Sequence, residues 1–557
     1  MRHLKHDYVG AWSRRVTINE GSDIQLESAA SAFAIHKVSP KLVAADPRMI
    51  DSMNAEVEDL LAFNPRLGCA KVEIVKLPAG AHEIRSTWAH KVKPDRIKSR
   101  VCPFGFMQIP ILEFNPAEVS SPVISLMSLN CLLVLCVTRG QFTGTIDADK
   151  AFSTSHLKEE IFMRPTSGWI LPPGHTLKLN TCLNGLVQAA WVWNHRINSW
   201  LLSIGFTRSV SEPCVYFRWD KGSQLVVCGL CVDDLRIQAD VEDSKNRTLE
   251  LYHKQFPAHE DETNSFMSFQ IEHNRETGEL WRSTAPHIDK MLDAFHMTDC
   301  NPCKLPAAPG SKLVKAVGLD EEAKAFPYEE LVGSLKWAAS TGSPQIRYAV
   351  GQVGKFTRNP DMTHVMAAKR ILRYLKGING RRILLRRGDG KIRVSVYSDA
   401  DFAGEPVSSE KAKCSTTGAV IFVEGVGLLE SYSALQTTIA LSTAEAELKA
   451  TATAARRAMI PRLLFQELGV LEDGPIRMYE DNAACSRIIS SNCAPSSMRH
   501  VEIEHHYARE LYDRRILVPV DCPSAEQVAD INTKNLSEEP FAQHTSTMFD
   551  GMSFAGA

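Results

Sequence analysis

The sequence predicts a multidomain protein that combines α/β and α+β architecture. A chain of 557 residues is too long for one hydrophobic core, so we expect two to four domains. Its apolar fraction of 44% and charged fraction of 23% are those of an ordinary globular protein. Segments that alternate like β-strands and segments with helical periodicity follow one another along most of the chain.

Charge and cysteine content narrow the classes of function. The formal net charge is −2, so any surface that binds nucleic acid must be local. The N-terminal stretch “MRHLKHDYVGAWSRR” lacks the apolar core of a secretory signal, and with fourteen cysteines we expect a reduced, intracellular protein. Two CxxC pairs, Cys228/Cys231 and Cys300/Cys303, are better explained as core thiols than as a zinc site.

The elements can be assigned in chain order, beginning after residues 1–45, which are weakly patterned. The apolar run Val123–Val137 is too short to span a bilayer and predicts a buried core helix, so we expect no membrane partner. In the first half we expect a helix at 46–64, a basic strand-like stretch at 88–100, the buried helix at 120–137, a strand ending at Asp147 and a helix at 187–202.

The second half continues this alternation. We expect a β-hairpin at 225–239, a strand ending near Asp399, a long helix at 443–468, a strand before Asp481 with a helix after it, and no pattern beyond residue 537. The His-rich stretch “RHVEIEHHYARE” alternates and predicts a strand, which would separate Glu502 from His506 and disfavours zinc.

A first set of acids lies where apolar strands give way to polar residues. Asp147 ends one strand, while Asp233 and Asp234 stand at the turn of the hairpin. A plain turn is one explanation for the pair, because Asp is common in turns. Three converging carboxylates would repel one another unless a cation were bound, and Mg²⁺ prefers oxygen ligands. Two such ions would support phosphoryl transfer.

A second set consists of Asp399, Glu447, Asp481 and Asp530. Ser442-x-x-Glu445 has the form of a capping box, which leaves Glu447 as the freer acid on its helix. Asp481 could simply cap the following helix, and a second box, Ser524-x-x-Gln527, places Asp530 in a short helix. Taken singly, each acid is better explained by structure; together they suggest a second metal site.

The motifs of the chain resemble the reverse transcriptase and ribonuclease H part of copia-type LTR retrotransposon polyproteins. The stretch “KSRVCPFGFMQ” is similar to the family's KARLVAKGFTQ, “IDADKAF” to its D-x-x-x-A-F block, “CLNGLVQAAWVWN” to SLYGLKQAPRQW, and “CVDDL” to YVDDL. Farther on, “AAKRILRYLKG” is similar to the connection region, and “YSDADFAG”, “ALSTAEAEL”, “EDNAAC” and “QVADINTKNL” to the ribonuclease H portion. The matches run in the family's order from about Asp46 to Phe541.

This resemblance implies a right-hand polymerase followed by an RNase H-like α/β domain. The implied parts are an N-terminal segment (1–45), fingers and palm (46–305), thumb or connection (306–392), the RNase H-like domain (393–537) and a C-terminal tail (538–557). The implied activities are RNA-directed DNA synthesis and cleavage of RNA in a hybrid. Implied partners are an RNA template, a DNA primer and product, RNA–DNA hybrid and dNTPs, while the oligomeric state is left open.

The resemblance also implies roles by position. Asp147, Asp233 and Asp234 would bind two Mg²⁺, with Mn²⁺ as an alternative, and Asp399, Glu447, Asp481 and Asp530 would bind the metals of RNase H. The implied nucleotide-binding residues are Lys98, Arg100, Phe152 (as a gate against the ribose 2′-OH), Gly185 and Gln188. The implied nucleic-acid-binding residues are Met267, in the primer-grip segment, and Lys369, Arg370, Arg373 and Lys376. A solvated helix face is the usual explanation of the basic run 369–393.

Several positions depart from the family pattern. Cys231 replaces the Tyr before Val-Asp-Asp, Phe104 replaces a basic residue, and Asp149 adds an acid that is either a bystander or a competing ligand. Residues that would contact nucleic acid or nucleotide in the family are replaced here, while the implied metal ligands remain. We therefore keep three functions open: a polymerase with RNase H, a degenerate nucleic-acid-binding copy without polymerase activity, and a chain with RNase H alone. We expect a cytoplasmic location, within virus-like particles, with access to the nucleus.

Overall fold

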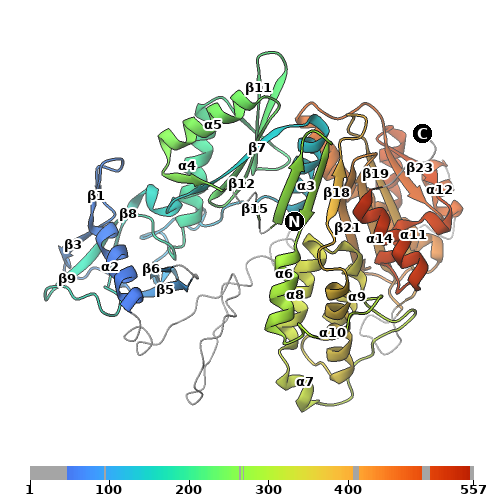
Figure 1. Ribbon diagram of the computed structural model, residues 1–557, viewed down its shortest axis with the longest axis horizontal. Helices are drawn as coiled ribbons and strands as arrows, with labels where there is room; N and C mark the ends of the chain where they lie inside the picture. The colour runs from blue at the N-terminus through green and yellow to red at the C-terminus, as the bar shows by residue number, and fades with distance from the viewer. Residues whose placement is uncertain are drawn as a thin grey trace. The chain divides into compact units, whose positions relative to one another are not determined.

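The computed structural model describes residues 47–92, 96–261, 265–267, 269–404, 413–491 and 502–551, with backbone alone at 47 and 502–506. The segment expected at 1–45 lies outside this part, as do residues 552–557 of the expected tail. Figure 1 shows the course of the helices and strands.

The first described region is a helix packed beside short strands. Helix α2 (Pro47–Leu61) buries Met49 and Leu60 and confirms the helix expected there. It contacts β6, and β5 and β6 pair antiparallel, which confirms the basic strand-like stretch. The strands of this region are β1 (Phe63–Asn64), β2 (Cys69–Ala70), β3 (Val72–Lys76), β4 (Glu83–Ile84), β5 (Ser86–Val92), β6 (Ile97–Pro103), β8 (His156–Met163) and β9 (His175–Thr181).

A six-stranded sheet follows, with the order β10-β11-β12-β13-β7-β14. Its strands are β7 (Phe142–Ala148), β10 (Thr207–Arg208), β11 (Val215–Asp220), β12 (Gln224–Cys231), β13 (Asp234–Ala239) and β14 (Ala258–Glu260). Its helices are α3 (Leu126–Arg139), α4 (Ala189–Ser203) and α5 (Glu242–Gln255). We refer to this sheet as the palm sheet, because it lies in the range 46–305 that is predicted to form fingers and palm.

Helix α3 is buried along almost its whole length, as the apolar run predicted. It begins at Leu126 rather than at residue 120, because Pro122 disfavours helix at Ser121 and Ser125 caps the first turn by accepting from the N–H of Ser128. The helix contacts β12 on one side and α11 and β21 of the C-terminal domain on another. One continuous hydrophobic core therefore supports the palm sheet and the C-terminal sheet.

A third region consists of a four-stranded sheet and a group of helices. The sheet contains β15 (Ser265–Phe266), β16 (Phe269–Asn274), β17 (Glu279–Ser283) and β18 (Ile383–Arg386). The helices are α6 (Ala285–Ala294), α7 (Glu321–Ala325), α8 (Tyr328–Thr341), α9 (Arg347–Gly354) and α10 (Met362–Gly377), whose apolar faces share one core. Strand β18 lies in the range expected for the connection, yet it pairs with β17.

The C-terminal domain is a five-stranded sheet with the order β21-β20-β19-β22-β23. Its strands are β19 (Val394–Asp401), β20 (Thr416–Val423), β21 (Gly427–Leu435), β22 (Ile476–Glu480) and β23 (Leu517–Asp521). Its helices are α11 (Thr443–Glu467), α12 (Ala483–Ser490), α13 (Glu502–Asp513) and α14 (Glu538–Asp550). The first three strands are antiparallel, and β22 and β23 join in parallel. Helix α11 packs on β19 and β20 (Figure 1).

Three local predictions were wrong. The stretch expected as a strand around residue 503 is helix α13, where Ala508 and Leu511 are buried three residues apart. Residues 538–550 form α14, which buries Phe541, Met548 and Phe549; the positions between them on the same face are the polar His544 and Thr545, so no apolar period stood out in the sequence. Gln527 makes no capping box with Ser524, because its amide donates to the carbonyl of Ser398 (3.0 Å).

The predicted fold class is confirmed. The described elements form a multidomain α/β and α+β protein, with largely antiparallel sheets in the first half and an α/β domain with a mixed sheet, β19–β23, in the second. In the described ranges no helix is both long and apolar enough to cross a membrane.

Candidate active sites

The hairpin β12–β13 brings Asp233 and Asp234 to the same end of the palm sheet as Asp147. Asp234 is opposite Cys231 within the hairpin and opposite Asp147 on β7. Val232 turns the chain with φ 57°, and its carbonyl accepts a hydrogen bond from the indole of the buried Trp193 (2.7 Å). The N–H of Ala148 donates to the carbonyl of Asp233 (3.2 Å), which ties the turn to β7.

The electrostatics of this palm site are those of unneutralised acids. Burial, followed by the charges of Asp233 and Asp147, raises the pKa of Asp234 to about 7. Burial and Asp233 likewise raise the pKa of Asp147. Burial and the same two turn acids raise the pKa of the Cys231 thiol to about 12, so this residue adds no charge at neutral pH. The protein alone leaves this site short of positive charge.

His259 is a neighbour of the palm acids that sequence reasoning missed. It lies on the three-residue strand β14, opposite Asp147. Its Nε2 is 3.6 Å from Asp147 Oδ2, and its Nδ1 is 3.3 Å from Asp149 Oδ1. Asp149 thus contacts a histidine. Strand β14 is too short to be recognised from pattern, so only the tertiary pairing reveals this histidine.

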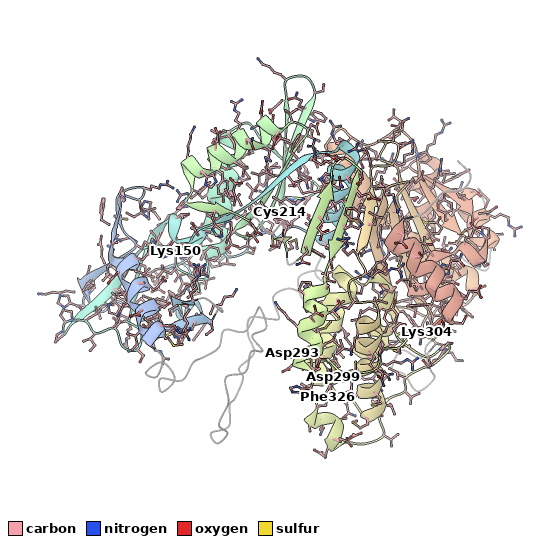
Figure 2. All side chains as sticks on the ribbon, in the orientation of Figure 1. Lys150, Cys214, Asp293, Asp299, Lys304 and Phe326 are labelled. Carbon is pink, nitrogen blue, oxygen red and sulfur yellow. The ribbon has the colours of Figure 1, made fainter. Side chains whose placement is uncertain are left out.

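The strand β6 presents Lys98 and Arg100 on its partly exposed side, because its residues alternate between buried and half-buried. Burial and the charge of Arg100 lower the pKa of Lys98, whereas Asp149 and Asp147 act in the opposite direction. Lys98 is therefore near the palm acids. Lys150, which Figure 2 labels, follows in the chain and adopts a left-handed conformation. Its Nζ is 2.5 Å from Asp59 Oδ2 on α2.

Gly185 and Gln188 lie in the segment expected to form the nucleotide pocket, and their hydrogen bonds tie it to neighbouring segments. The N–H of Gly105 donates to the carbonyl of Gly185 (3.1 Å), which joins the end of β6 to this turn. Gln188 is 3% exposed; its amide donates to the carbonyl of Glu113 (2.9 Å) and its oxygen accepts from Gln108 (3.0 Å). These contacts give Gln188 a packing role, and its binding of nucleotide stays a prediction.

Replacing Gly185 by Ala should destabilise this segment. A Cβ at Gly185 would lie 2.4 Å from the carbonyl oxygen of Pro103, and the φ of +116° is unfavourable for any side chain. We expect the unfolding midpoint to fall by at least about 4 °C in a calorimetric scan. Gly380→Ala is the matched control, because its φ of +95° is also unfavourable for a side chain and nothing lies within 4 Å of the added Cβ. Equal shifts in the two variants would contradict the packing argument.

Phe152 and Met267 occupy positions at the edges of the palm. Phe152 follows Asp147 on a short 3₁₀ turn, Ala151–Thr154, and packs half-buried against two hydrophobic cores. Met267 lies at the tip of the β15–β16 hairpin with φ 52°. Their roles as gate and primer contact stay predictions.

The four cations expected to bind nucleic acid on α10 are engaged within the protein. Arg370, Arg373 and Lys376 donate to the carbonyls of Leu305 (3.2 Å), Asn301 (2.6 Å) and Cys300 (2.7 Å) respectively. Lys369 lies 4.5 Å from the centre of the Phe326 ring. These contacts fasten residues 300–305 and Phe326 to α10, and any phosphate contact by the same groups stays a prediction.

The second acidic set forms a compact site in the C-terminal domain. Asp399 on β19, Glu447 on α11 and Asp481 after β22 each offer a carboxylate oxygen within 4.8 Å of the others. In the part of the chain that the structure describes, they are the one group of three such ligands; Asp147, Asp233 and Asp234 do not approach one another as closely, and no cysteine belongs to a group of this kind. Asn482, not Asp481, caps α12, which leaves Asp481 available.

Asp530 lies beside this triad but outside it. Its 3₁₀ turn, Val528–Asn532, packs closely on Gly418, the residue opposite Asp399, where a Cβ would lie 2.6 Å from the carbonyl of Ala529. The hydroxyl of Thr533 donates to Asp399 (2.5 Å), and Asp530 pairs with Lys534 at 2.8 Å.

Glu480 is a second residue that sequence reasoning missed. It is 1% exposed and accepts from the hydroxyls of Ser398 and Thr451, each at 3.0 Å. Its alternation with Ile476 and Met478 on β22 was a signal in the sequence, because residues two apart face the same side of a strand. Glu480 is thus a buried acid close to Glu447.

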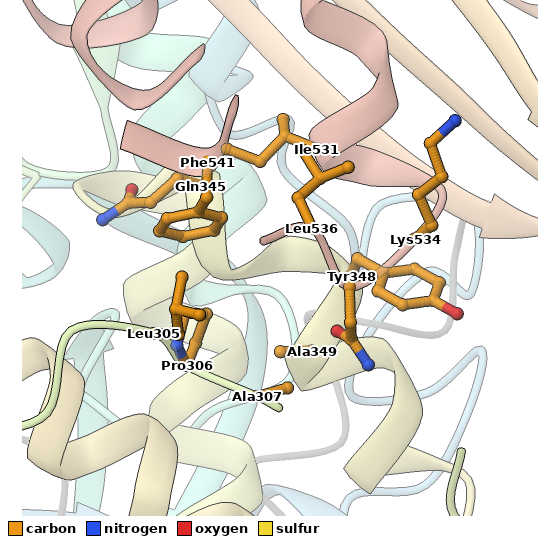
Figure 3. Close-up of a pocket in the computed structure, with 11 residues that line it drawn as sticks. Leu305, Pro306, Ala307, Gln345, Tyr348, Ala349, Ile531, Lys534, Leu536 and Phe541 are labelled. Carbon is orange, nitrogen blue, oxygen red and sulfur yellow. The ribbon is translucent and has the colours of Figure 1, made fainter. Parts of the chain in front are cut away.

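The fit of this site to a divalent cation rests on its chemistry. Burial and neighbouring acids raise the pKa of Glu447 to about 11 and that of Asp399 to about 6. Glu447 Oε2 is buried and accepts no hydrogen bond from the described residues. Oxygen ligands with uncompensated charge suit a hard cation such as Mg²⁺. A small pocket lined by Leu305, Tyr348, Ile531 and Phe541 contains none of these acids (Figure 3).

Without divalent ions, stability should fall as pH rises. Glu447 and Glu480, with pKa values of about 11 and 8, keep protons in the folded state that they release in the unfolded state above about pH 4.5. The folded state therefore binds more protons, and the free energy of unfolding declines with pH through the range 7 to 9. Asp234 contributes with the same sign.

The expected measurement is a series of unfolding midpoints in EDTA between pH 6.5 and 9. We expect a declining midpoint in the wild type, a shallower decline in Glu447→Gln, and a shallower decline in the wild type when Mg²⁺ replaces EDTA. A midpoint that rises with pH in EDTA would contradict the raised pKa values.

Comparisons with known proteins were made on the chain and on its fold. Residues 70–309 match the family model described as reverse transcriptase (RNA-dependent DNA polymerase). The chain is 29% identical over 518 residues, 90% of its length, to the retrovirus-related Pol polyprotein from transposon TNT 1-94 of Nicotiana tabacum. It is 30% identical over 455 residues, 81% of its length, to the corresponding polyprotein from transposon RE1 of Arabidopsis thaliana.

These alignments cover 38% and 30% of the two polyproteins, so the chain spans about a third of the length of the curated relatives it matches. Among solved structures, the foamy viral protease-reverse transcriptase dRH in complex with ds DNA aligns with 86% of this chain and 70% of its own. That alignment has 11% identity and a TM-score of 0.48.

Proposed function

We propose that this chain copies RNA into DNA and cleaves the RNA strand of the resulting hybrid, because residues 70–309 match the reverse transcriptase family model and the chain is similar to transposon Pol polyproteins. The observation that supports both activities best is the presence of two acidic centres on one chain. Asp147, Asp233 and Asp234 meet at one end of the palm sheet, and Asp399, Glu447 and Asp481 form the triad.

In DNA synthesis, the palm acids would hold Mg²⁺, or Mn²⁺ in its place. Bound ions would supply stabilisation of the attacking and leaving oxygens of phosphoryl transfer. The protein's own contribution is positional: the Val232 turn and the Trp193 hydrogen bond fix the two hairpin acids opposite β7. Lys98 and Arg100 would face the triphosphate of a dNTP, whose charge they complement.

Phe152 would discriminate against the ribose 2′-OH, and Met267 would contact the DNA primer at the tip of its hairpin. Gly185 and Gln188 would shape the pocket from behind, since both are held by the backbone of the neighbouring segment. The RNA template and the DNA product would occupy the surface next to these residues.

In hybrid cleavage, Asp399, Glu447 and Asp481 would hold one divalent ion, and Asp530 would complete the site for a second. Thr533 orients Asp399 through its hydroxyl, while Glu480 fixes β19 to α11 through Ser398 and Thr451. An RNA–DNA hybrid can be recognised by groove shape and 2′-hydroxyls without reading sequence.

The first test is primer extension by the purified chain on poly(rA)/oligo(dT) with Mg²⁺, run beside cleavage of a labelled RNA–DNA hybrid. We expect both activities. Cleavage without extension would instead select a chain that retains RNase H alone. Binding of the template with neither activity would select a degenerate copy that keeps the fold and no chemistry.

A further inference from the structure

The side chain of Lys534 carries a positive charge into the acid cluster of the C-terminal domain. Its Nζ lies 2.8 Å from Asp530 Oδ1; the side chain of Asp530 is 16% exposed and that of Lys534 is 45% exposed. Figure 3 shows the stem of Lys534 at the rim of the small pocket with its ammonium group directed away from Leu305 and Pro306. The apolar part of the Lys534 side chain thus lines the pocket, and its ammonium group points away from it.

This ion pair differs from the surface pairs of the same spacing. Arg514 and Glu510 are also four residues apart, but each side chain is 62% exposed, and such pairs contribute little. The charges of Asp399, Asp530 and Asp401 raise the pKa of Lys534 against the effect of its burial. The charge of Lys534 therefore interacts with three acids, whereas the Arg514–Glu510 ion pair involves two groups.

The geometry divides the acids of this domain into two groups. Asp399, Glu447 and Asp481 converge on one another, whereas Asp530 forms an ion pair with an ammonium group. Thr533 holds Asp399 through one oxygen, and Lys534 follows the turn that carries Asp530, with its N–H donating to the carbonyl of Asp530 (3.2 Å). The segment Asp530–Lys534 thus places both Asp530 and the ammonium group of Lys534 beside Asp399.

We propose that Lys534 is a positioning residue that occupies the place of a second divalent cation beside Asp530 and must withdraw before that cation binds. The inference rests on the proposed RNase H function, because it assigns the second ion of that site. Lys534 would set the concentration at which the second ion binds, and it would keep Asp530 neutralised and in place when the ion is absent. The chemical class of the ligand is a hard divalent cation, Mg²⁺ or Mn²⁺.

The test is Mn²⁺ binding to the full chain, measured without nucleic acid by the paramagnetic resonance signal of free Mn²⁺. Lys534→Met keeps most of the apolar stem and Lys534→Gln keeps a polar head, and both remove the charge. We expect each to bind the weakest Mn²⁺ about tenfold more tightly than the wild type, because the competing cation is gone. Lys534→Arg should restore weak binding. The palm acids are the same in every variant, so their ions cancel in the comparison.

Lys391→Gln is the matched control, since Lys391 forms a 2.8 Å pair with Glu472 in the same domain, outside the described acid cluster. It removes the same charge and should leave Mn²⁺ binding within twofold of the wild type. A purely structural lysine would give weaker Mn²⁺ binding when it is lost, so loosened binding in both charge-removing variants would overturn the proposal. Unchanged binding, or a change equal to that of Lys391→Gln, would overturn it as well.

Failure of the proposed function is distinguishable from failure of this inference. The binding measurement needs no turnover, so a chain that never cleaves hybrid can still show the effect of Lys534. Conversely, cleavage of hybrid by a chain whose Mn²⁺ binding ignores Lys534 would uphold the function and reject the inference.

Discussion

Replacing Asp233 by Asn is expected to lower primer extension on an RNA template by at least about 10³-fold, while cleavage of RNA in a hybrid continues at the wild-type rate. Asp233 shares the hairpin turn with Asp234 and raises the pKa of both Asp234 and Asp147, so it belongs to the electrostatic unit of the palm. Its loss leaves the triad around Asp399 untouched. Extension of a labelled primer and release of labelled RNA, measured on the same preparation, provide the two rates.

Asp149→Asn is the matched control for this variant. Asp149 is two residues from Asp147 and contacts His259, but it does not take part in the pairing of β7 with β13. We expect extension within about fivefold of the wild type, which would identify Asp149 as a bystander. A loss equal to that of Asp233→Asn would make Asp149 a ligand. If the folded Asp233 variant also lost hybrid cleavage, the two sites would not be independent.

Replacing Glu447 by Gln is expected to lower hybrid cleavage by at least about 10³-fold and to leave primer extension within about twofold. In the absence of metal the raised pKa keeps Glu447 protonated, so Gln mimics its shape and should preserve the fold. The same substitution removes a ligand when a divalent ion is present. Cleavage rates as a function of Mg²⁺ concentration, with an unfolding scan beside them, separate the two effects.

Glu445→Gln on the same helix is the control. Glu445 is buried, accepts from the N–H of Leu441 (2.8 Å) and pairs with Lys449 (2.8 Å), so it stabilises the start of α11. We expect a lower unfolding midpoint and nearly normal cleavage below that midpoint. A reversed outcome, with cleavage lost in the Glu445 variant and kept in the Glu447 variant, would show that the two acids were assigned the wrong way round.

The fold could be predicted from the sequence wherever a helix or strand has a strong periodicity of apolar residues. The limits of α11 were found almost to the residue, because Ser442 caps it and small apolar residues fill its buried face. The hairpin of Asp233 and Asp234 was found as well, since the run Leu225–Leu230 before the pair is apolar and Leu235 and Ile237 alternate with polar residues after it. Helix α13 was missed because alternation over a few residues of a helix can imitate a strand. The family resemblance, borne out by the reverse transcriptase match, also implied a domain order, which stays a prediction.

The candidate sites were predicted less completely, for physical reasons. Acids at strand ends could be named, because charge next to a buried strand is unusual. His259 could not, since a short strand brings it to the acids through tertiary pairing alone. Lys534 stands only four residues after Asp530, but its effect on Asp399 depends on the fold. The basic helix α10 shows the opposite case: its charges predicted an outer surface, and the structure engages them with backbone carbonyls. Sequence shows that a charge exists, whereas only the fold shows which partner it has.

Strand β18 restricts how a protein of this kind can be divided or recombined. Its four residues pair with β17, and the N–H of Arg386 donates to the carbonyl of Val426 at the turn before β21. A cut before β18 would leave β17 as an open edge prone to aggregation, and a cut after it would leave that turn without its neighbour. The parts of the chain that carry the two proposed sites are therefore not interchangeable modules. A recombinant that takes one part from another transposon would have to preserve the contacts of β18 with β17 and with the turn before β21. The two parts are therefore expected to be inherited together.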